Sequence, residues 1–242
     1  MYVWVHSGTA LRDFCSSALL KLLSKTILKC FTWFIISAAF VRRHLLQTQE
    51  MTVTEKDFIL ASSSPQRRKL LEQIGYRPKK VQPADIDESI HKYEKPAAYV
   101  KRMAQEKARK VAGLCPGENI LASDTVVVVN TKILQKAQND EEQVRVMKLL
   151  SGKAHRVLSA VCLISRDGRE SLKLSTTRIL MKKLSEEEIR NYVAGREWVG
   201  CSGYKIEGEL AAYVRKIIGS YSGVVGLPLY ETKNMLNGAG VK

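Results

Sequence analysis

The pattern of hydrophobic and polar positions predicts a strand, a tight turn and a helix between residues 58 and 75. An apolar run at residues 58–61 stops at three serines, and Pro65 then opens a helical pattern that ends at Gly75. Ser64 is placed to cap this helix. The free backbone N–H groups of a helix N-terminus favour anions, so the turn is a candidate phosphate site.

Residues 120–129 form the most strand-like stretch of the chain. A continuous apolar run of this kind is typical of a central strand that is buried on both faces. Asp124 interrupts the run, and a carboxylate in such a strand needs a compensating partner or a cation. We therefore expect Asp124 to have a chemical role, with a purely structural aspartate as the alternative.

The remaining elements continue the alternation of strands and helices. A helix predicted at residues 96–112 carries Lys107 on its apolar face, where a lysine either snorkels to the surface or reaches into a cleft to bind phosphate. The other expected elements are a strand near 80–82, a helix at 140–150 capped by Asp140 with Gln143 completing a capping box, strands at 155–165 and 169–180 joined by a turn at 167–168, a helix begun by a capping box of Ser185 and Glu188, and a closing helix at about 230–236.

Residues 1–50 differ in composition from the rest of the chain. They hold six Lys and Arg residues against two acidic residues. Their apolar run at residues 30–41 is about half of the roughly 20 residues that a membrane span needs. We expect a disordered or spurious extension, with Met51 as the natural start and one domain over residues 51–242. An interfacial helix and a genuine signal or anchor remain as alternatives.

Composition and charge narrow the class of partner. The 242-residue chain is 45% apolar and carries a formal net charge of +15, which implies an anionic partner such as a nucleotide, a nucleic acid or a membrane surface. The five cysteines include no C-x-x-C pair and the four histidines show no metal-binding spacing. Neither a zinc site nor a disulfide framework is indicated, and a reducing compartment, the cytoplasm, is the simplest inference.

Several charged residues are candidates for phosphate or metal binding. Arg67 and Arg68 lie in the first turn of the first helix, where they form either a solvated basic turn or part of a polyphosphate site. An acidic loop that includes Glu88 is either solvated or supplies oxygen ligands to Mg²⁺. Lys136 follows Asp124 by twelve residues, so a short turn and a returning segment can bring the two together.

Four stretches together resemble the Maf family of nucleoside triphosphate pyrophosphatases. They are LASSSPQRRKLL at residues 60–71, ASDTVV at 122–127, LSGKAHRV at 150–157 and GSYSGVVGLPL at 219–229. Their order and spacing match the family over about residues 58–236, and residues 1–50 have no counterpart.

The resemblance implies a fold, a reaction and a set of site residues. The fold is α/β and similar to that of ITPases, with an elongated central mixed β-sheet, flanking helices and a cleft between two lobes. The reaction is hydrolysis of a nucleoside triphosphate to the monophosphate and diphosphate with a divalent cation, Mg²⁺ or Mn²⁺. The family's roles fall on Asp124 as proton acceptor, on Glu88 and Asp124 for the metal, and on Ser62, Gln66, Arg67, Arg68, Lys107, Thr125, Lys136 and Glu207 for the substrate.

The base-specificity positions depart from the family pattern. The dTTP/UTP-type members typically have Arg where Gln66 stands and Gln where Glu207 stands. A glutamate at the second position resembles the 7-methyl-GTP branch, whereas Thr125 resembles the dTTP/UTP branch. A glutamate accepts hydrogen bonds but cannot donate one as an amide does, so the preferred base stays open.

Two other classes of function compete with this interpretation. A nucleic-acid-binding regulator without nucleotide turnover fits the charge of +15 and the family's link to septum formation, but no nucleic-acid-binding signature is present. A membrane-associated protein anchored by residues 1–50 is the second. For the enzyme, the resemblance also implies the clearing of non-canonical or modified nucleotides. We expect nucleoside triphosphates as partners, no stable nucleic-acid complex and no membrane insertion, and we leave a homodimer open.

Overall fold

The computed structural model describes residues 53–241, so the interpretations of residues 1–50 lie outside the described residues. The strands are β1 (Thr54–Leu60), β2 (Tyr76–Val81), β3 (Ile120–Val129), β4 (Lys132–Ile133), β5 (Ala154–Ile164), β6 (Glu170–Met181) and β7 (Val214–Ile218). The helices are α2 (Pro65–Gln73), α3 (Pro96–Leu114), α4 (Asp140–Leu150), α5 (Glu186–Ala194), the 3₁₀ helix η1 (Glu209–Tyr213), α6 (Tyr221–Val225) and α7 (Leu229–Gly238). None of the described helices is long and apolar enough to cross a membrane.

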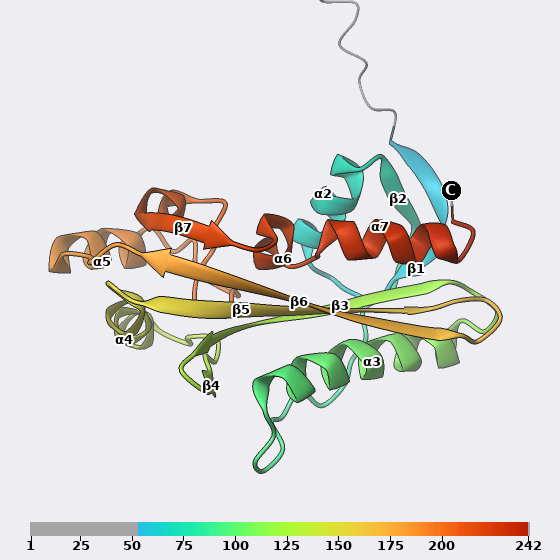
Figure 1. Cartoon of the computed structure of the whole chain (residues 1–242), viewed down its shortest axis with the longest axis horizontal. Helices are drawn as coiled ribbons and strands as arrows, with labels where there is room; N and C mark the ends of the chain where they lie inside the picture. Colours follow the sequence, from blue (N-terminus) through green and yellow to red (C-terminus); the bar gives the residue numbers. More distant parts are fainter. Residues whose placement is uncertain (1–52, 242) are drawn as a thin grey trace, which may run out of the picture. The chain divides into compact units, whose positions relative to one another are not determined.

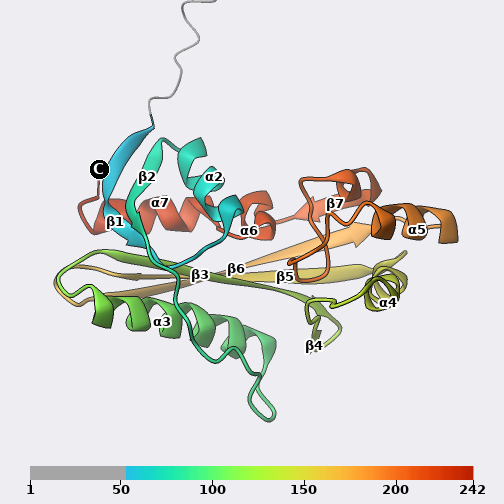
Figure 2. The same ribbon diagram turned by 180° about the vertical axis from the view of Figure 1, so that it is seen from behind.

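The strands form one mixed sheet, as the family resemblance implied. Its order is β2-β1-β3-β5-β6-β7, and β4 pairs with β3 outside this path. β1 runs parallel to both of its neighbours, whereas β3, β5, β6 and β7 pair antiparallel. In Figure 1, α3 covers one face of the sheet and α7 covers the other, with α2 beside α7. Figure 2 shows the same layers from behind, with α4 and α5 at the opposite end of the sheet.

Three apolar clusters hold these layers together. The inner face of α3 packs on alternate residues of β3, including Ala122 and Val126. α2 and α7 pack on the other face of the same half of the sheet, around Phe58 and Leu121. A third cluster, which includes the fully buried Tyr192, joins α4 and α5 to the far ends of β3, β5 and β6. The sheet thus connects two lobes, each with its own core.

The middle of β3 has an open edge. β1 pairs with β3 only at Ile120 and Leu121 and then ends, while β4 pairs only with Val128 and Val129. Between these points, no other strand of the described chain pairs with this edge of β3. Asp124 lies in the middle of this gap. Because side chains alternate along a strand, Asp124 faces α3 while Thr125 faces the opposite side.

The structure corrects several element boundaries. The N-cap of α4 is Asn139, whose side chain accepts a hydrogen bond from the Glu142 N–H, so Asp140 is the first helical residue. Gln143 takes no part in a capping box and is buried against another segment. β2 begins at Tyr76, earlier than predicted, since an edge strand tolerates its central proline and charged residues. The capping box of Ser185 and Glu188 is confirmed.

A buried histidine in the α4–α5 lobe makes folding stability depend on pH. His155 of β5 is buried and its Nε2 lies 2.6 Å from the Tyr204 hydroxyl, while Nδ1 has no hydrogen-bond partner among the described residues. Burial lowers the pKa of His155 from 6.5 to about 4. The unfolded chain therefore binds a proton that the folded chain excludes, and stability falls as the pH drops below 6.5 toward 4.

We expect His155→Gln to flatten this dependence. From pH 7.5 to pH 5, the wild type should lose about 2 kcal/mol more unfolding free energy than the variant. Urea unfolding of both proteins at the two pH values measures the difference. The carboxylates are the same in both proteins, so their contributions to the unfolding free energy cancel in the comparison. Equal losses would show that His155 is not the group responsible.

Candidate active site

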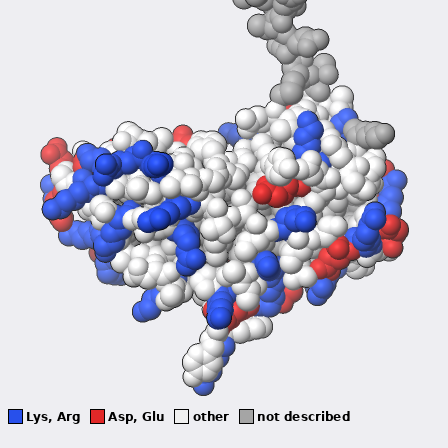
Figure 3. All heavy atoms as spheres, in the orientation of Figure 1, with Lys and Arg blue, Asp and Glu red and all other residues white. Residues whose placement is uncertain are grey.

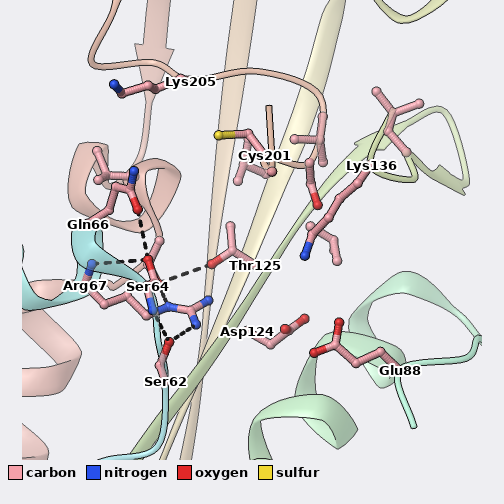
Figure 4. A pocket seen from close by; sticks show the side chains of 18 of the residues that line it. Ser62, Ser64, Gln66, Arg67, Glu88, Asp124, Thr125, Lys136, Cys201 and Lys205 are labelled. Carbon is pink, nitrogen blue, oxygen red and sulfur yellow. Dashed lines mark hydrogen bonds between the residues drawn. The ribbon is translucent and has the colours of Figure 1, made fainter. Parts of the chain in front are cut away.

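A cavity of about 870 Å³ opens along the unpaired edge of β3. Residues from both lobes line it. Nine of the residues predicted from the sequence are among them, namely Ser62, Gln66, Arg67, Glu88, Lys107, Asp124, Thr125, Lys136 and Glu207. Arg68 is exposed on α2 and is not among the lining residues. Figure 4 shows how several of these side chains lie around the cavity.

The turn between β1 and α2 holds Arg67 in place. Ser64 caps α2 by accepting a hydrogen bond from the Arg67 N–H at 3.5 Å. The Arg67 guanidinium donates from Nη1 to Ser62 Oγ at 2.8 Å and from Nε to the Gly226 carbonyl at 2.9 Å. Burial lowers the pKa of Arg67, although the charges of Asp124 and Glu88 act in the opposite direction. The side chain is therefore a fixed cation at the cavity wall.

Lys107 joins the two carboxylates that the family resemblance assigned to the metal. Its Nζ lies 2.7 Å from Asp124 Oδ1 and 2.6 Å from Glu88 Oε1. Lys107 and Asp124 are both buried, whereas Glu88 is half exposed. Lys107 thus reaches into the cleft, and the buried Asp124 has the compensating partner that its position requires. Burial raises the pKa of Glu88, but the hydrogen bond and charge of Lys107 outweigh it, so this pKa lies below its ordinary value.

The acidic loop is attached to α3 at two points. The Tyr99 hydroxyl donates to the Glu88 carbonyl at 2.9 Å, and Arg102 Nη2 donates to the Ser89 carbonyl at 2.9 Å. Burial, together with the charges of Asp124 and Glu88, raises the pKa of Tyr99 to about 12, so the hydroxyl remains a donor. These contacts keep the Glu88 carboxylate beside the Lys107 ammonium. Figure 4 shows the carboxylates of Glu88 and Asp124 close to each other.

The backbone carbonyl of Gly226 accepts hydrogen bonds both from α2 and from the face of β3 that is opposite to Asp124. It accepts hydrogen bonds from Arg67 Nε, from Ser123 Oγ at 3.0 Å and from Thr125 Oγ1 at 3.3 Å. Gly226 has a φ of 137°, a conformation that favours glycine. Ser159 of β5 completes the arrangement, since its hydroxyl lies 2.7 Å from Thr125 Oγ1 and donates to the Gly223 carbonyl.

Cavity residues that sequence reasoning missed come mainly from irregular segments. Cys201 and Lys205 line the cavity together with Glu207. Ser123 and Ser159 are not among the lining residues, and they support the wall through hydrogen bonds to the Gly226 and Gly223 carbonyls. Tyr99 also lines it. The glycine-rich composition around residues 200–208 indicates close approach to a ligand, but no periodicity shows which of its side chains turn inward.

The oxygen donors in the cavity suit a hard cation. Mg²⁺ commonly takes one or two protein carboxylates and completes its shell with water and substrate phosphates. Asp124 and Glu88 are two such carboxylates, and they converge within hydrogen-bond distance of one point, the Lys107 ammonium. Within residues 53–241, no cluster of three or more His, Cys, Asp or Glu side chains forms a protein-only metal site. The two carboxylates, Asp124 and Glu88, fit a cation that is shared with a phosphate ligand.

Comparison with known proteins identifies the family. The model of the family described as Maf-like protein matches residues 57–239. A dTTP/UTP pyrophosphatase from Caulobacter vibrioides is 46% identical over 185 residues, which cover 76% of this chain and 96% of that protein. A dTTP/UTP pyrophosphatase from Zymomonas mobilis is 48% identical over 183 residues, covering 75% and 91%. A solved structure of a HAM1 protein from Coxiella burnetii has 14% sequence identity and a TM-score of 0.41, over 76% of this chain and 98% of that one. The extent and identity of these sequence matches show that the chain belongs to the Maf family of nucleoside triphosphate pyrophosphatases.

Proposed function

We propose that this protein hydrolyses nucleoside 5′-triphosphates to the monophosphate and diphosphate in the cavity along β3. The observation that carries the proposal is the meeting of two kinds of group in one cavity. The carboxylates of Asp124 and Glu88 line the same cavity as the cations Arg67, Lys107 and Lys136, and Lys107 contacts both carboxylates. A triphosphate needs cations to neutralise its charge, and its hydrolysis needs a base to accept a proton from water.

Each residue has a distinct part in this proposal. Asp124 accepts the proton of the attacking water as the bond between the α- and β-phosphates breaks. Arg67 and Lys136 contact phosphate oxygens, and Arg67 is already oriented by Ser62 and Gly226. Asp124 and Glu88 would hold the divalent cation, which supplies further neutralisation of phosphate charge when bound. Fixed positions let these groups stabilise developing charge without reorganising.

The nucleoside would occupy the part of the cavity lined by Gln66, Thr125 and Glu207. In Figure 4, Gln66 and Lys205 lie at the end of the cavity away from Glu88, while Thr125 lies between the two ends. The curated relatives are named dTTP/UTP pyrophosphatases, and Thr125 resembles that branch. We therefore propose dTTP and UTP as the first substrates to test. The clearing of modified nucleotides and the link to septum formation follow from the family resemblance alone.

The proposal is tested by a hydrolysis screen with Mg²⁺ or Mn²⁺. Common and modified nucleoside triphosphates are incubated with the full chain, and the products are separated by ion-exchange chromatography. We expect equal amounts of monophosphate and diphosphate, with dTTP and UTP among the preferred substrates. Release of orthophosphate, or no turnover of any triphosphate, would contradict the proposal.

The alternative function, nucleic-acid binding without turnover, would use a different surface. Figure 3 shows Lys and Arg side chains spread over one face, with a denser group over the end of the sheet where β7 and α5 lie. Arg178 of β6 and Arg215 and Lys216 of β7 are exposed there. This alternative predicts salt-dependent binding of DNA with no hydrolysis of nucleotides. We propose nucleoside triphosphates as the partners and the cytoplasm as the location, where the free cysteines of the described chain would stay reduced.

Replacing the Arg and Lys side chains that we propose to contact phosphate should reduce turnover more than it reduces folding stability. We expect Arg67→Ala and Lys136→Ala each to lower kcat/KM roughly 10- to 100-fold, as the loss of a charge-assisted contact of about 1.5–3 kcal/mol predicts. Arg68 stays a predicted phosphate contact, but its exposed position outside the cavity lining leads us to expect a smaller loss for Arg68→Ala. Steady-state kinetics measure all three. Unchanged kinetics in any variant would remove that residue from the site.

A chain that begins at Met51 should keep full activity. The family match begins at residue 57, and the relatives align with about three quarters of this chain. All of the lining residues of the cavity come after residue 60. Activity and solubility of the shortened chain, measured beside those of the full chain, check the expectation. Aggregation or lost turnover in the shortened chain alone would assign residues 1–50 to the enzyme.

A further inference from the structure

The wall of the cavity that carries Cys201, Lys205 and Glu207 is a long segment without regular structure. It joins α5 to η1 and includes no helix or strand between residues 195 and 208. Such loops are flexible unless buried contacts hold them, and long loops of this kind are often functional. The position of this wall, and therefore the shape of the nucleoside end of the cavity, depends on what anchors the segment.

Three consecutive residues of the segment are each anchored by a buried side chain from a different element. Gln143 of α4 donates from Nε2 to the Gly203 carbonyl at 2.7 Å. A hydrogen bond of 2.6 Å joins Nε2 of His155, on β5, to the Tyr204 hydroxyl. The backbone N–H of Lys205 donates to the Tyr192 hydroxyl of α5 at 3.2 Å. Gln143, His155 and Tyr192 are at most 3% exposed, so each bond is made away from solvent.

The local packing leaves the anchored residues little freedom. Gly203 has a φ of 84°, and a Cβ there would lie 3.4 Å from the Val127 side chain of β3. A buried amide or hydroxyl that loses its hydrogen-bond partner destabilises the folded state. Each of these hydrogen bonds therefore favours a single position of the backbone. The anchors lie behind the wall and do not line the cavity, whereas Tyr204 and Lys205 do. A displacement of the anchored residues would move the wall that carries Lys205 and Glu207 relative to the rest of the nucleoside end of the cavity.

We propose that Gln143 and Tyr192, together with His155, are positioning residues that fix the 195–208 segment and so determine which nucleoside the cavity accepts. The inference rests on the proposed function for its ligand, a nucleoside triphosphate. Removal of an anchor should raise KM and change the preference between bases, and should leave the phosphate chemistry around Asp124 largely intact. The two effects separate because the anchors bond to the 195–208 segment, whereas Asp124 and Glu88 bond to Lys107.

The test uses two anchor variants and one matched control. Tyr192→Phe and Gln143→Leu remove the hydrogen bonds to the segment while keeping most of the side-chain volume. Tyr76→Phe removes a comparable bond, from the Tyr76 hydroxyl to Asn237 Oδ1 at 2.9 Å, in the other lobe. We expect the anchor variants to raise KM at least fivefold with less than a threefold change in kcat, and to change the ratio of kcat/KM between dTTP and a purine triphosphate. Tyr76→Phe should change neither.

A second readout does not need catalysis. Cys201 lies in the segment and Cys115 follows α3 in the other lobe, and both are partly exposed. Iodoacetamide labelling of the full chain, resolved by peptide mass spectrometry, should be several-fold faster at Cys201 in the anchor variants and unchanged at Cys115. Unchanged labelling would overturn the anchoring, and faster labelling with unaltered KM and base preference would overturn the role in specificity. A wild type that hydrolyses no triphosphate would instead contradict the proposed function, and the labelling would still decide whether the anchors hold the segment.

Discussion

Asp124→Asn should lower kcat by about 10³-fold or more with a divalent cation present, because it removes the only group assigned to accept the proton of water. The substitution keeps the shape of the side chain and an oxygen that can accept from Lys107. It removes the negative charge and the basicity. Lys107 retains Glu88 as a partner at 2.6 Å, so we expect only a modest loss of thermal stability.

The measurement compares diphosphate release and thermal unfolding in Asp124→Asn and in a matched control. Asp85→Asn makes the same chemical change in the acidic loop, at an exposed residue that does not line the cavity. The control should keep wild-type turnover. If a folded Asp124→Asn protein hydrolysed triphosphates near the wild-type rate, both the assignment of Asp124 and the mechanism built on it would be wrong.

Lys107→Met should cost both stability and activity. The methionine fills similar volume but leaves Asp124 buried beside Glu88 without a cation between them. Breaking a buried ion pair from one side typically destabilises a protein by about 3 kcal/mol or more. The loss of the lysine charge should also raise the pKa of Glu88, which that charge now holds down. Weaker triphosphate binding follows from the lost positive charge in the cavity.

A double variant separates the two effects. In Lys107→Met combined with Asp124→Asn, the uncompensated buried charge is gone, so part of the lost stability should return while kcat stays at least as low as in Asp124→Asn. Urea unfolding and diphosphate release of both single variants and the double variant complete the cycle. Strictly additive losses of unfolding free energy would show that Lys107 and Asp124 are not coupled, contrary to the 2.7 Å contact between them.

The sequence alone predicted the local elements whose signals lie within a few residues. The serine turn before α2 and the capping box of α5 were recognised because caps depend on side chains three or four positions away. The apolar run of β3 identified a central strand, because burial on both faces favours apolar residues at most positions, here all except Ser123, Asp124 and Thr125. Nine of the residues named from the family motifs line one cavity in the structure, and their roles there stay predictions.

Only the tertiary structure decided how these pieces meet. Two adjacent arginines look equivalent in sequence, yet the helix turns Arg67 into the cavity and Arg68 toward solvent, because side chains one residue apart point about 100° apart on a helix. The partner of Asp124 comes from α3, seventeen residues earlier, and the anchors of the 195–208 segment come from α4, β5 and α5. Such contacts depend on packing between distant elements, so no local pattern in the sequence records them.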